Sequence, residues 1–181
     1  MKAFIIILSS FFINLKLLSQ QISYPIKIET PLFKNLHQIN DSIFRGDQPD
    51  SLDIRLLNNL GIKSLLNLRR YHNDTLFLGN NTSLHLYHVK MNAYCFNNKK
   101  IIESLKIIKN APKPILIHCK HGSDRTGVIV AMYRIIFENY SKKEAIKELK
   151  TKKYGFHRIF INIPIYIKIV NSNKIREKVI K

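Results

Sequence analysis

The sequence is poor in cysteine, because Cys95 and Cys119 are the only two in 181 residues. Small exported domains that depend on disulfides contain more, so a disulfide framework is excluded. We keep the hypothesis of a single reversible disulfide between Cys95 and Cys119. The alternative for Cys95 is a small, buried apolar side chain.

Patterns for metals and nucleotides are also missing. The seven histidines do not show the i, i+4 spacing with a carboxylate that is typical of zinc sites. No glycine-rich turn for a dinucleotide follows a predicted strand. We therefore expect neither a metal ion nor a cofactor.

Acidic residues are scarce, with 12 Asp and Glu against 30 Lys and Arg, which gives a formal net charge of +18. Such a charge favours anionic partners, namely phosphorylated substrates, nucleic acid or acidic membrane surfaces. Part of the excess accompanies the many Asn and Ile residues as a compositional bias. The charge alone does not choose among these partners.

No apolar run is long enough for a helix that spans the hydrocarbon core of a bilayer. The charged start Met1-Lys2 precedes an apolar run at 3–13 and a polar restart near Ser19 and Gln20. This order is typical of a secretory signal peptide, which we place at residues 1–20. We expect export to the periplasm or the medium. The alternatives are a retained membrane anchor and an N-terminal segment packed on the core.

The remaining residues, about 160, suffice for one domain and are too few for two. Residues 21–41 have no clear period, so we expect an extended approach segment before a domain at 42–181, and residues 69–81 look polar and irregular. Apolar patterns favour strands at 43–44, 62–68, 84–89 and 115–118, and helices at 50–60, 97–110, 127–137, 145–153 and 160–179. This alternation predicts a single α/β domain with a central, mostly parallel sheet flanked by helices on both faces.

A polar loop between an apolar strand and an apolar helix carries the strongest signal. It begins at Cys119 and ends at Arg125, so successive backbone N–H groups can converge at the N-terminus of the helix. A phosphate dianion fits such a site, because Arg125 can bind two of its oxygens and the same donors favour the thiolate form of Cys119. A thiolate beneath a bound phosphate is positioned to attack the phosphorus atom as a nucleophile.

The segment His118-Cys119-x5-Arg125-Thr126-Gly127 resembles the signature loop of the cysteine-dependent phosphatases, the protein tyrosine and dual-specificity superfamily. Residues 43–49, 61–69 and 154–157 are similar to a bacterial dual-specificity-like branch whose loop reads His-Cys-x-His-Gly-x-Asp-Arg-Thr-Gly. The resemblance implies a dual-specificity phosphatase-like fold. It also implies hydrolysis of phosphate monoesters through a phosphocysteine intermediate.

The resemblance gives each residue of the loop a role. Cys119 would attack phosphorus, and Thr126 would steady the thiolate when water releases the phosphate. His118 would orient the loop by hydrogen bonding. The alternative is a buried histidine that only makes its own hydrogen bonds and has no role in the reaction. The predicted phosphate-binding residues are Lys120, His121, Gly122, Ser123, Asp124 and Arg125.

The general acid is the least conventional part of this site. Most dual-specificity phosphatases place an aspartate roughly 25 to 35 residues before the cysteine, whereas residues 86–97 contain no carboxylate. Asp124 is the expected replacement, because Asp-Arg-Thr resembles the loop of the myotubularin and Sac-domain phosphatases, where a loop aspartate has been proposed as the acid. Four lesser candidates, each expected to be a loop or surface group, are Asp47, Asp74, His88 and His157.

Two substrate classes remain open. The main hypothesis is a dual-specificity or tyrosine phosphatase acting on phosphoproteins, and the alternative is the same chemistry on phosphoinositides or inositol phosphates, which Lys120 and His121 would suit. The leader argues against an RNA 5′-triphosphatase, and the intact Cys119 and Arg125 argue against a non-catalytic phosphate-binding module. We expect no stable membrane span unless the leader is retained.

Overall fold

The computed structural model describes residues 25–31, 33–78 and 83–181, so the predicted leader lies outside the described residues. Six strands form one sheet in the order β1-β2-β3-β6-β4-β5. The inner strands β3 (Ile43–Gly46), β6 (Ile115–His118), β4 (Ser64–Asn67) and β5 (His85–His88) are parallel. Two antiparallel strands, β1 (Ile26–Lys27) and β2 (His37–Asn40), extend one edge. The predicted α/β fold with a mostly parallel sheet is confirmed.

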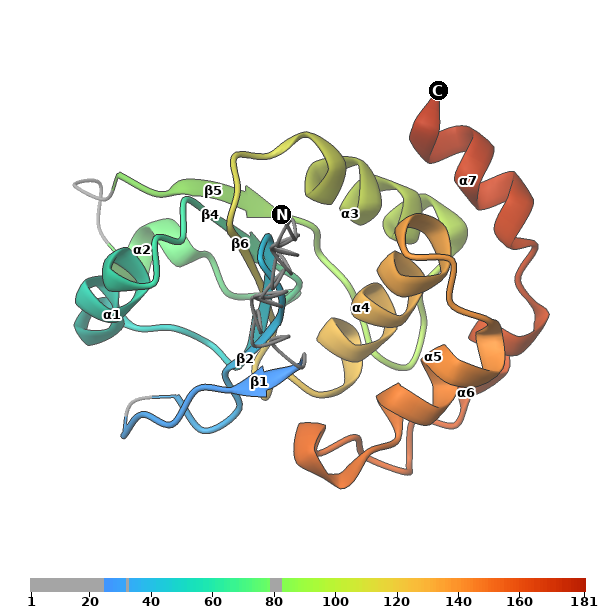
Figure 1. Ribbon diagram of the computed structural model, residues 1–181, viewed down its shortest axis with the longest axis horizontal. Helices are drawn as coiled ribbons and strands as arrows, with labels where there is room; N and C mark the ends of the chain where they lie inside the picture. The colour runs from blue at the N-terminus through green and yellow to red at the C-terminus, as the bar shows by residue number, and fades with distance from the viewer. Residues whose placement is uncertain (1–24, 32, 79–82) are drawn as a thin grey trace, which may run out of the picture.

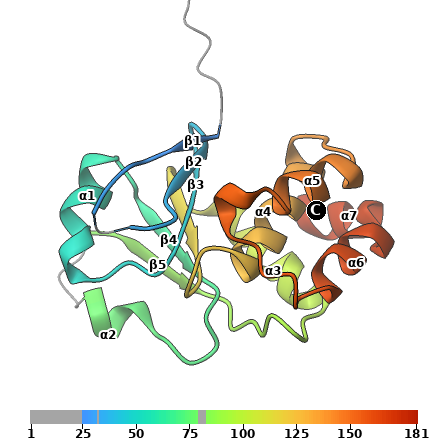
Figure 2. The same ribbon diagram turned by 90° about the horizontal axis from the view of Figure 1, so that it is seen from below.

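Helices cover both faces of this sheet (Figures 1 and 2). One face carries the 3₁₀ turn η1 (Ser51–Asp53), α1 (Ile54–Asn59) and α2 (Asp74–Leu78). The other carries α3 (Asn98–Asn110), α4 (Asp124–Phe137), α5 (Lys142–Leu149), the 3₁₀ turn η2 (Lys152–Tyr154), α6 (Asn162–Ile169) and α7 (Ser172–Ile180). In the described residues no helix is both long enough and apolar enough to cross a membrane.

The strands alternate between two hydrophobic cores, because successive side chains of a strand point to opposite faces. Leu65 and Leu116 pack into the core beneath α1, whereas Leu66, Ile115 and Ile117 pack into the larger core around α4. This larger core buries α4 on nearly every side, as its continuous apolar sequence predicts. The start of α4 is therefore held firmly against the end of β6.

The N-terminal segment 21–41 and the segment 69–81 differ from the sequence-based expectations. The segment 21–41 was expected to be only an extended approach, but β1 and β2 join the sheet and Leu36 and Ile39 are buried in the cores. The domain therefore begins before the predicted boundary at Ser42. The irregular segment 69–81 contains the short helix α2, which begins at Asp74.

The C-terminal segment forms two helices where the sequence predicted one at 160–179. The chain leaves the helical conformation at Val170, and the Asn171 side chain then caps α7 by accepting a hydrogen bond from the backbone N–H of Lys174. An Asn that can cap a new helix competes with continuation of the old one.

Candidate active site

The loop that begins at Cys119 lies where β3, β6 and β4 end side by side, with Gly46, His118 and Asn67 in register. It leads directly into α4 (Figure 1). Ligands of parallel sheets bind at this carboxyl edge.

Both cysteines are free thiols, Cys119 buried and Cys95 exposed, so the alternative of a buried Cys95 is wrong. A bridge between them stays a prediction for oxidising conditions.

Gly122 lets the loop pack tightly against the end of β3. Its φ is +68°, which L side chains rarely adopt. A Cβ at this position would lie 2.5 Å from the backbone C and O of Gly46 and 2.7 Å from the backbone N of Asp47. No side chain fits there without moving the backbone of β3.

Three successive carbonyl groups of the loop accept hydrogen bonds from outside it. The Lys120 carbonyl accepts from the Gln48 N–H at 3.4 Å, the His121 carbonyl from Asn35 Nδ2 at 2.8 Å, and the Gly122 carbonyl from Arg45 Nη2 at 2.8 Å. In a trans peptide the next N–H points the opposite way. The N–H groups of the loop are thereby directed inward, as an anion site requires.

Arg45 is the buried member of this set, and sequence analysis gave it no role. Its guanidinium lies 3.8 Å from the centroid of the Tyr154 ring, a cation–π contact. Burial lowers the pKa of Arg45 to about 10, so the side chain stays charged at neutral pH. The sequence signals were its place directly after the predicted strand at 43–44 and within residues 43–49, which carry part of the family resemblance.

A buried pair supports the other side of the loop. His118 Nε2 lies 2.7 Å from Asp74 Oδ2, and Asp74 Oδ1 accepts hydrogen bonds from Asn67 and Gln48. Burial alone would raise the pKa of Asp74, but the hydrogen bond and charge of His118 outweigh it and hold that pKa below its usual value. Asp74 is therefore a buried partner of His118, which corrects the prediction of a loop or surface group.

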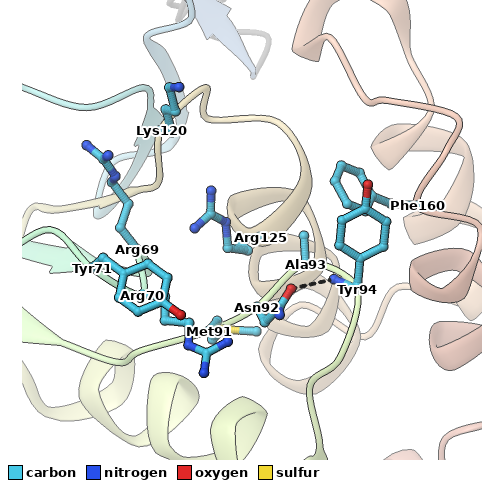
Figure 3. Close-up of a pocket in the computed structure, with 10 residues that line it drawn as sticks. All are labelled: Arg69, Arg70, Tyr71, Met91, Asn92, Ala93, Tyr94, Lys120, Arg125 and Phe160. Carbon is cyan, nitrogen blue, oxygen red and sulfur yellow. Dashed lines mark hydrogen bonds between the residues drawn. The ribbon is translucent and has the colours of Figure 1, made fainter.

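A pocket of about 450 Å³ opens over the loop (Figure 3). Among the described residues, four cationic side chains and three aromatic rings line it, and no carboxylate does. The cations are Arg69, Arg70, Lys120 and Arg125, and the rings are Tyr71, Tyr94 and Phe160. Burial, followed by repulsion from Arg125, lowers the pKa of Arg69. A polyanionic guest relieves this repulsion.

Asn92 also lines this pocket, in the stretch where related enzymes place an acid, and its side chain accepts a hydrogen bond from the Tyr94 N–H. Asn92 cannot donate a proton as a carboxylic acid does. The structure thus agrees with the sequence in placing no carboxylate of residues 86–97 over the loop.

The structure brings two of the predicted acid candidates together. Asp124 Oδ2 lies 2.9 Å from His157 Nδ1, and Asp124 Oδ1 accepts from the His157 backbone N–H at 3.0 Å. The His157 ring contacts the rings of His121, in the loop, and Phe160, in the pocket wall. This pair lies beside the loop and borders the pocket.

The other candidates have partners that hold the backbone. Asp47 accepts from the N–H groups of Lys34 and Asn35, and His88 Nε2 lies 2.6 Å from the Arg69 carbonyl oxygen. The Thr126 hydroxyl is buried and has no hydrogen-bond partner among the described residues. In the part of the chain that the structure describes, no cluster of three His, Cys, Asp or Glu side chains is arranged to hold a metal ion.

Comparison with known proteins is consistent with this geometry. A family model described as the tyrosine phosphatase family matches residues 32–180. The dual specificity protein phosphatase TpbA of Pseudomonas aeruginosa (strain UCBPP-PA14) is 27% identical over 123 residues, covering 67% of this chain and 56% of that protein. Inositol diphosphatase DSP2 of Oryza sativa subsp. japonica is 32% identical over 133 residues, covering 65% of each. The chain thus spans between half and two thirds of these relatives.

Among solved structures, a variant of P. aeruginosa TpbA in complex with pTyr superposes with a TM-score of 0.78. The match is 21% identical and covers 90% of this chain and 99% of that one. At this identity the likeness shows the fold, which is shared over nearly the whole length of both chains.

The contact between Gly122 and Gly46 predicts the outcome of a matched pair of substitutions. Gly122→Ala should weaken binding of inorganic phosphate by more than about tenfold, because the methyl group displaces the loop amides. Gly61→Ala is the control, since Gly61 has φ +69° and open space around its Cβ position. Both variants pay a left-handed backbone cost of about 1 kcal/mol in the free energy of unfolding.

Titration calorimetry with phosphate and urea unfolding measure the two effects separately. Equal phosphate affinity in both variants would contradict the role of this contact.

Proposed function

This chain belongs to the tyrosine phosphatase family, and we propose that it is a cysteine-dependent phosphatase that hydrolyses phosphate monoesters. The observation that carries the proposal is the set of outward carbonyl groups, held by Gln48, Asn35 and Arg45, around a buried Cys119. Such a loop binds the three equatorial oxygens of a phosphoryl group above the sulfur.

The reaction proceeds in two displacements. The Cys119 thiolate attacks phosphorus, the P–O bond to the leaving group breaks, and a phosphocysteine forms. Water then attacks phosphorus, the S–P bond breaks, and the thiolate and inorganic phosphate are released. Arg125 and the loop amides stabilise the charge in both steps. The buried, unpartnered hydroxyl of Thr126 supports its role as a donor to the departing thiolate.

The leaving group needs a proton when its P–O bond breaks, and we assign the delivery of this proton to the pair Asp124–His157. Asp124 Oδ1 accepts a hydrogen bond from the His157 backbone N–H, and Asp124 Oδ2 lies 2.9 Å from His157 Nδ1. If His157 donates through Nδ1–H, then Nε2 carries the transferable proton when the ring is charged. Asp124 would then position His157, whereas the sequence pointed to Asp124 as the acid itself.

Phosphoproteins, with phosphotyrosine foremost, are the substrate class we favour. The aromatic rings of Tyr71, Tyr94 and Phe160 flank the cations of the pocket and can pack against a phenyl phosphate. The name of the relative TpbA and the pTyr bound to its structure support this assignment.

The second candidate is an inositol phosphate or phosphoinositide. In the part of the chain that the structure describes, four cations and no carboxylate line the pocket, which suits a head group with several phosphates. One relative is named an inositol diphosphatase. Neither the pocket nor the relatives favour an RNA 5′-triphosphatase or a non-catalytic phosphate-binding module. We also propose that the chain acts outside the cytoplasm, on the basis of the leader predicted at residues 1–20.

Phosphate release under reducing conditions tests the proposed reaction. The substrates are a phosphotyrosine peptide, a phosphoserine peptide, phosphoinositides, inositol polyphosphates and a 5′-triphosphate RNA. We expect the highest kcat/KM on the phosphotyrosine peptide. Cys119→Ser should abolish turnover and retain phosphate binding, whereas Cys95→Ser should leave turnover unchanged. Turnover that survives in Cys119→Ser would contradict the mechanism.

The acid assignment predicts a dependence on the leaving group. His157→Gln and Asp124→Asn should lower kcat about 100-fold on an alkyl phosphate and less than about tenfold on p-nitrophenyl phosphate, whose leaving group needs no proton. His85→Gln, at an exposed histidine on β5, is the control. If kcat falls equally on both substrates, the pair holds the loop and delivers no proton.

A further inference from the structure

The helix α6 has an apolar side that no other described element covers. Four isoleucines are exposed along α6 and the turn before it, namely Ile159, Ile161, Ile165 and Ile169, at 67%, 65%, 51% and 72%. The last three are spaced by four residues, so they share one side of the helix. The alternate residues Ile163 and Ile167 are buried in the large core. This helix is therefore apolar on two sides, and only one of them is covered.

The position of α6 leaves this side accessible. The helix packs against α4 and α5 through its inner side and lies at the outer edge of the helical layer (Figure 2). No other described element covers the exposed isoleucines, which sets them apart from isolated surface side chains. Apolar patches of this kind mark sites of protein or membrane contact.

The surroundings of the isoleucines are cationic. A groove of about 800 Å³ next to them is lined by Lys150, Lys152 and Arg158 together with Phe156, Ile161 and Pro164. Between Lys150 and Ile169 the sequence has no Asp or Glu, and its five Lys and Arg residues are Lys150, Lys152, Lys153, Arg158 and Lys168. We refer to the four exposed isoleucines and the three cations that line the groove, Lys150, Lys152 and Arg158, as the α6 face.

We propose that the α6 face docks on an anionic phospholipid bilayer. A row of large apolar side chains bordered by Lys and Arg is the pattern of helices that lie in the membrane interface. The isoleucines would enter the boundary between head groups and acyl chains, and the cations would bind lipid phosphates. A purely apolar protein partner would not require the cations of the groove, and an acidic protein would leave the isoleucine row unused.

The α6 face is next to the catalytic pocket. Phe160, between Ile159 and Ile161 in the chain, lines the pocket that contains Arg125. Docking would therefore hold the pocket mouth close to the bilayer, within reach of phosphate groups at its surface. Lipid binding itself does not depend on the proposed phosphatase reaction, so the two proposals can fail separately.

The absence of tryptophan from the sequence offers a direct test in the full chain. Ile165→Trp places a single indole on the α6 face, and Ile180→Trp places one on α7 as a matched control. With phosphatidylcholine–phosphatidylserine vesicles the emission of the first variant should shift to the blue, and brominated lipids should quench it. The control should show neither effect. Any binding by the N-terminal leader is common to both variants.

Charge variants test the second half of the proposal in the Ile165→Trp background. Replacing Lys150, Lys152 and Arg158 by Gln should weaken vesicle binding about fivefold for each charge, whereas replacing Lys174 and Lys178 on α7 should have little effect. Equal binding to phosphatidylcholine alone would overturn the role of charge. A blue shift that needs no lipid and grows with protein concentration would assign the face to contact with a second copy of the chain. Indole emission that is unchanged by vesicles would overturn the proposal.

Discussion

The buried guanidinium of Arg45 is the constraint on which the site depends. It turns the Gly122 carbonyl away from the phosphate position and lies over the Tyr154 ring, so it connects β3, the catalytic loop and the segment after α5. A charge buried without such partners would cost several kcal/mol. Since one guanidinium contacts both the Gly122 carbonyl and the Tyr154 ring, the loop conformation and the packing of Tyr154 are coupled.

The same arrangement divides the loop into two chemical sides. Carbonyl oxygens face the protein, where Arg45, Asn35 and the Gln48 N–H bind them, and N–H groups face the pocket. The Asp74–His118 pair adds a second buried support where β6 ends. A phosphate therefore enters a site that is already organised, and the cations of the pocket extend its positive potential toward the solvent.

Local signals in the sequence predicted the local features well. Capping pairs form between Asp50 and Asp53 and between Ser141 and Glu144, each three residues apart, and Gly61 and Gly155 end their segments with positive φ. The strand, loop and helix around Cys119 also follow directly from the order of apolar and polar residues. Each of these features depends on neighbours a few residues apart.

Features that depend on distant partners could not be predicted in this way. Asp74 is 44 residues from His118, and Arg45 is 77 residues from Gly122. The strand β1 is only two residues long, so pairing with β2 defines it more than its own sequence does. The motif predicted Asp124 as a site residue, but its contact with His157 depends on where the chain returns after η2.

The measurement that tests the account most directly is detection of the phosphocysteine. The protein is mixed with p-nitrophenyl phosphate, quenched in acid within milliseconds and analysed by intact mass and peptide mapping. The account predicts one added phosphoryl group on the peptide that contains Cys119, formed at a rate at least equal to turnover. Phosphate release in steady state with no phosphoryl group on Cys119 at any time point, although the method recovers one from a known cysteine phosphatase, would contradict it.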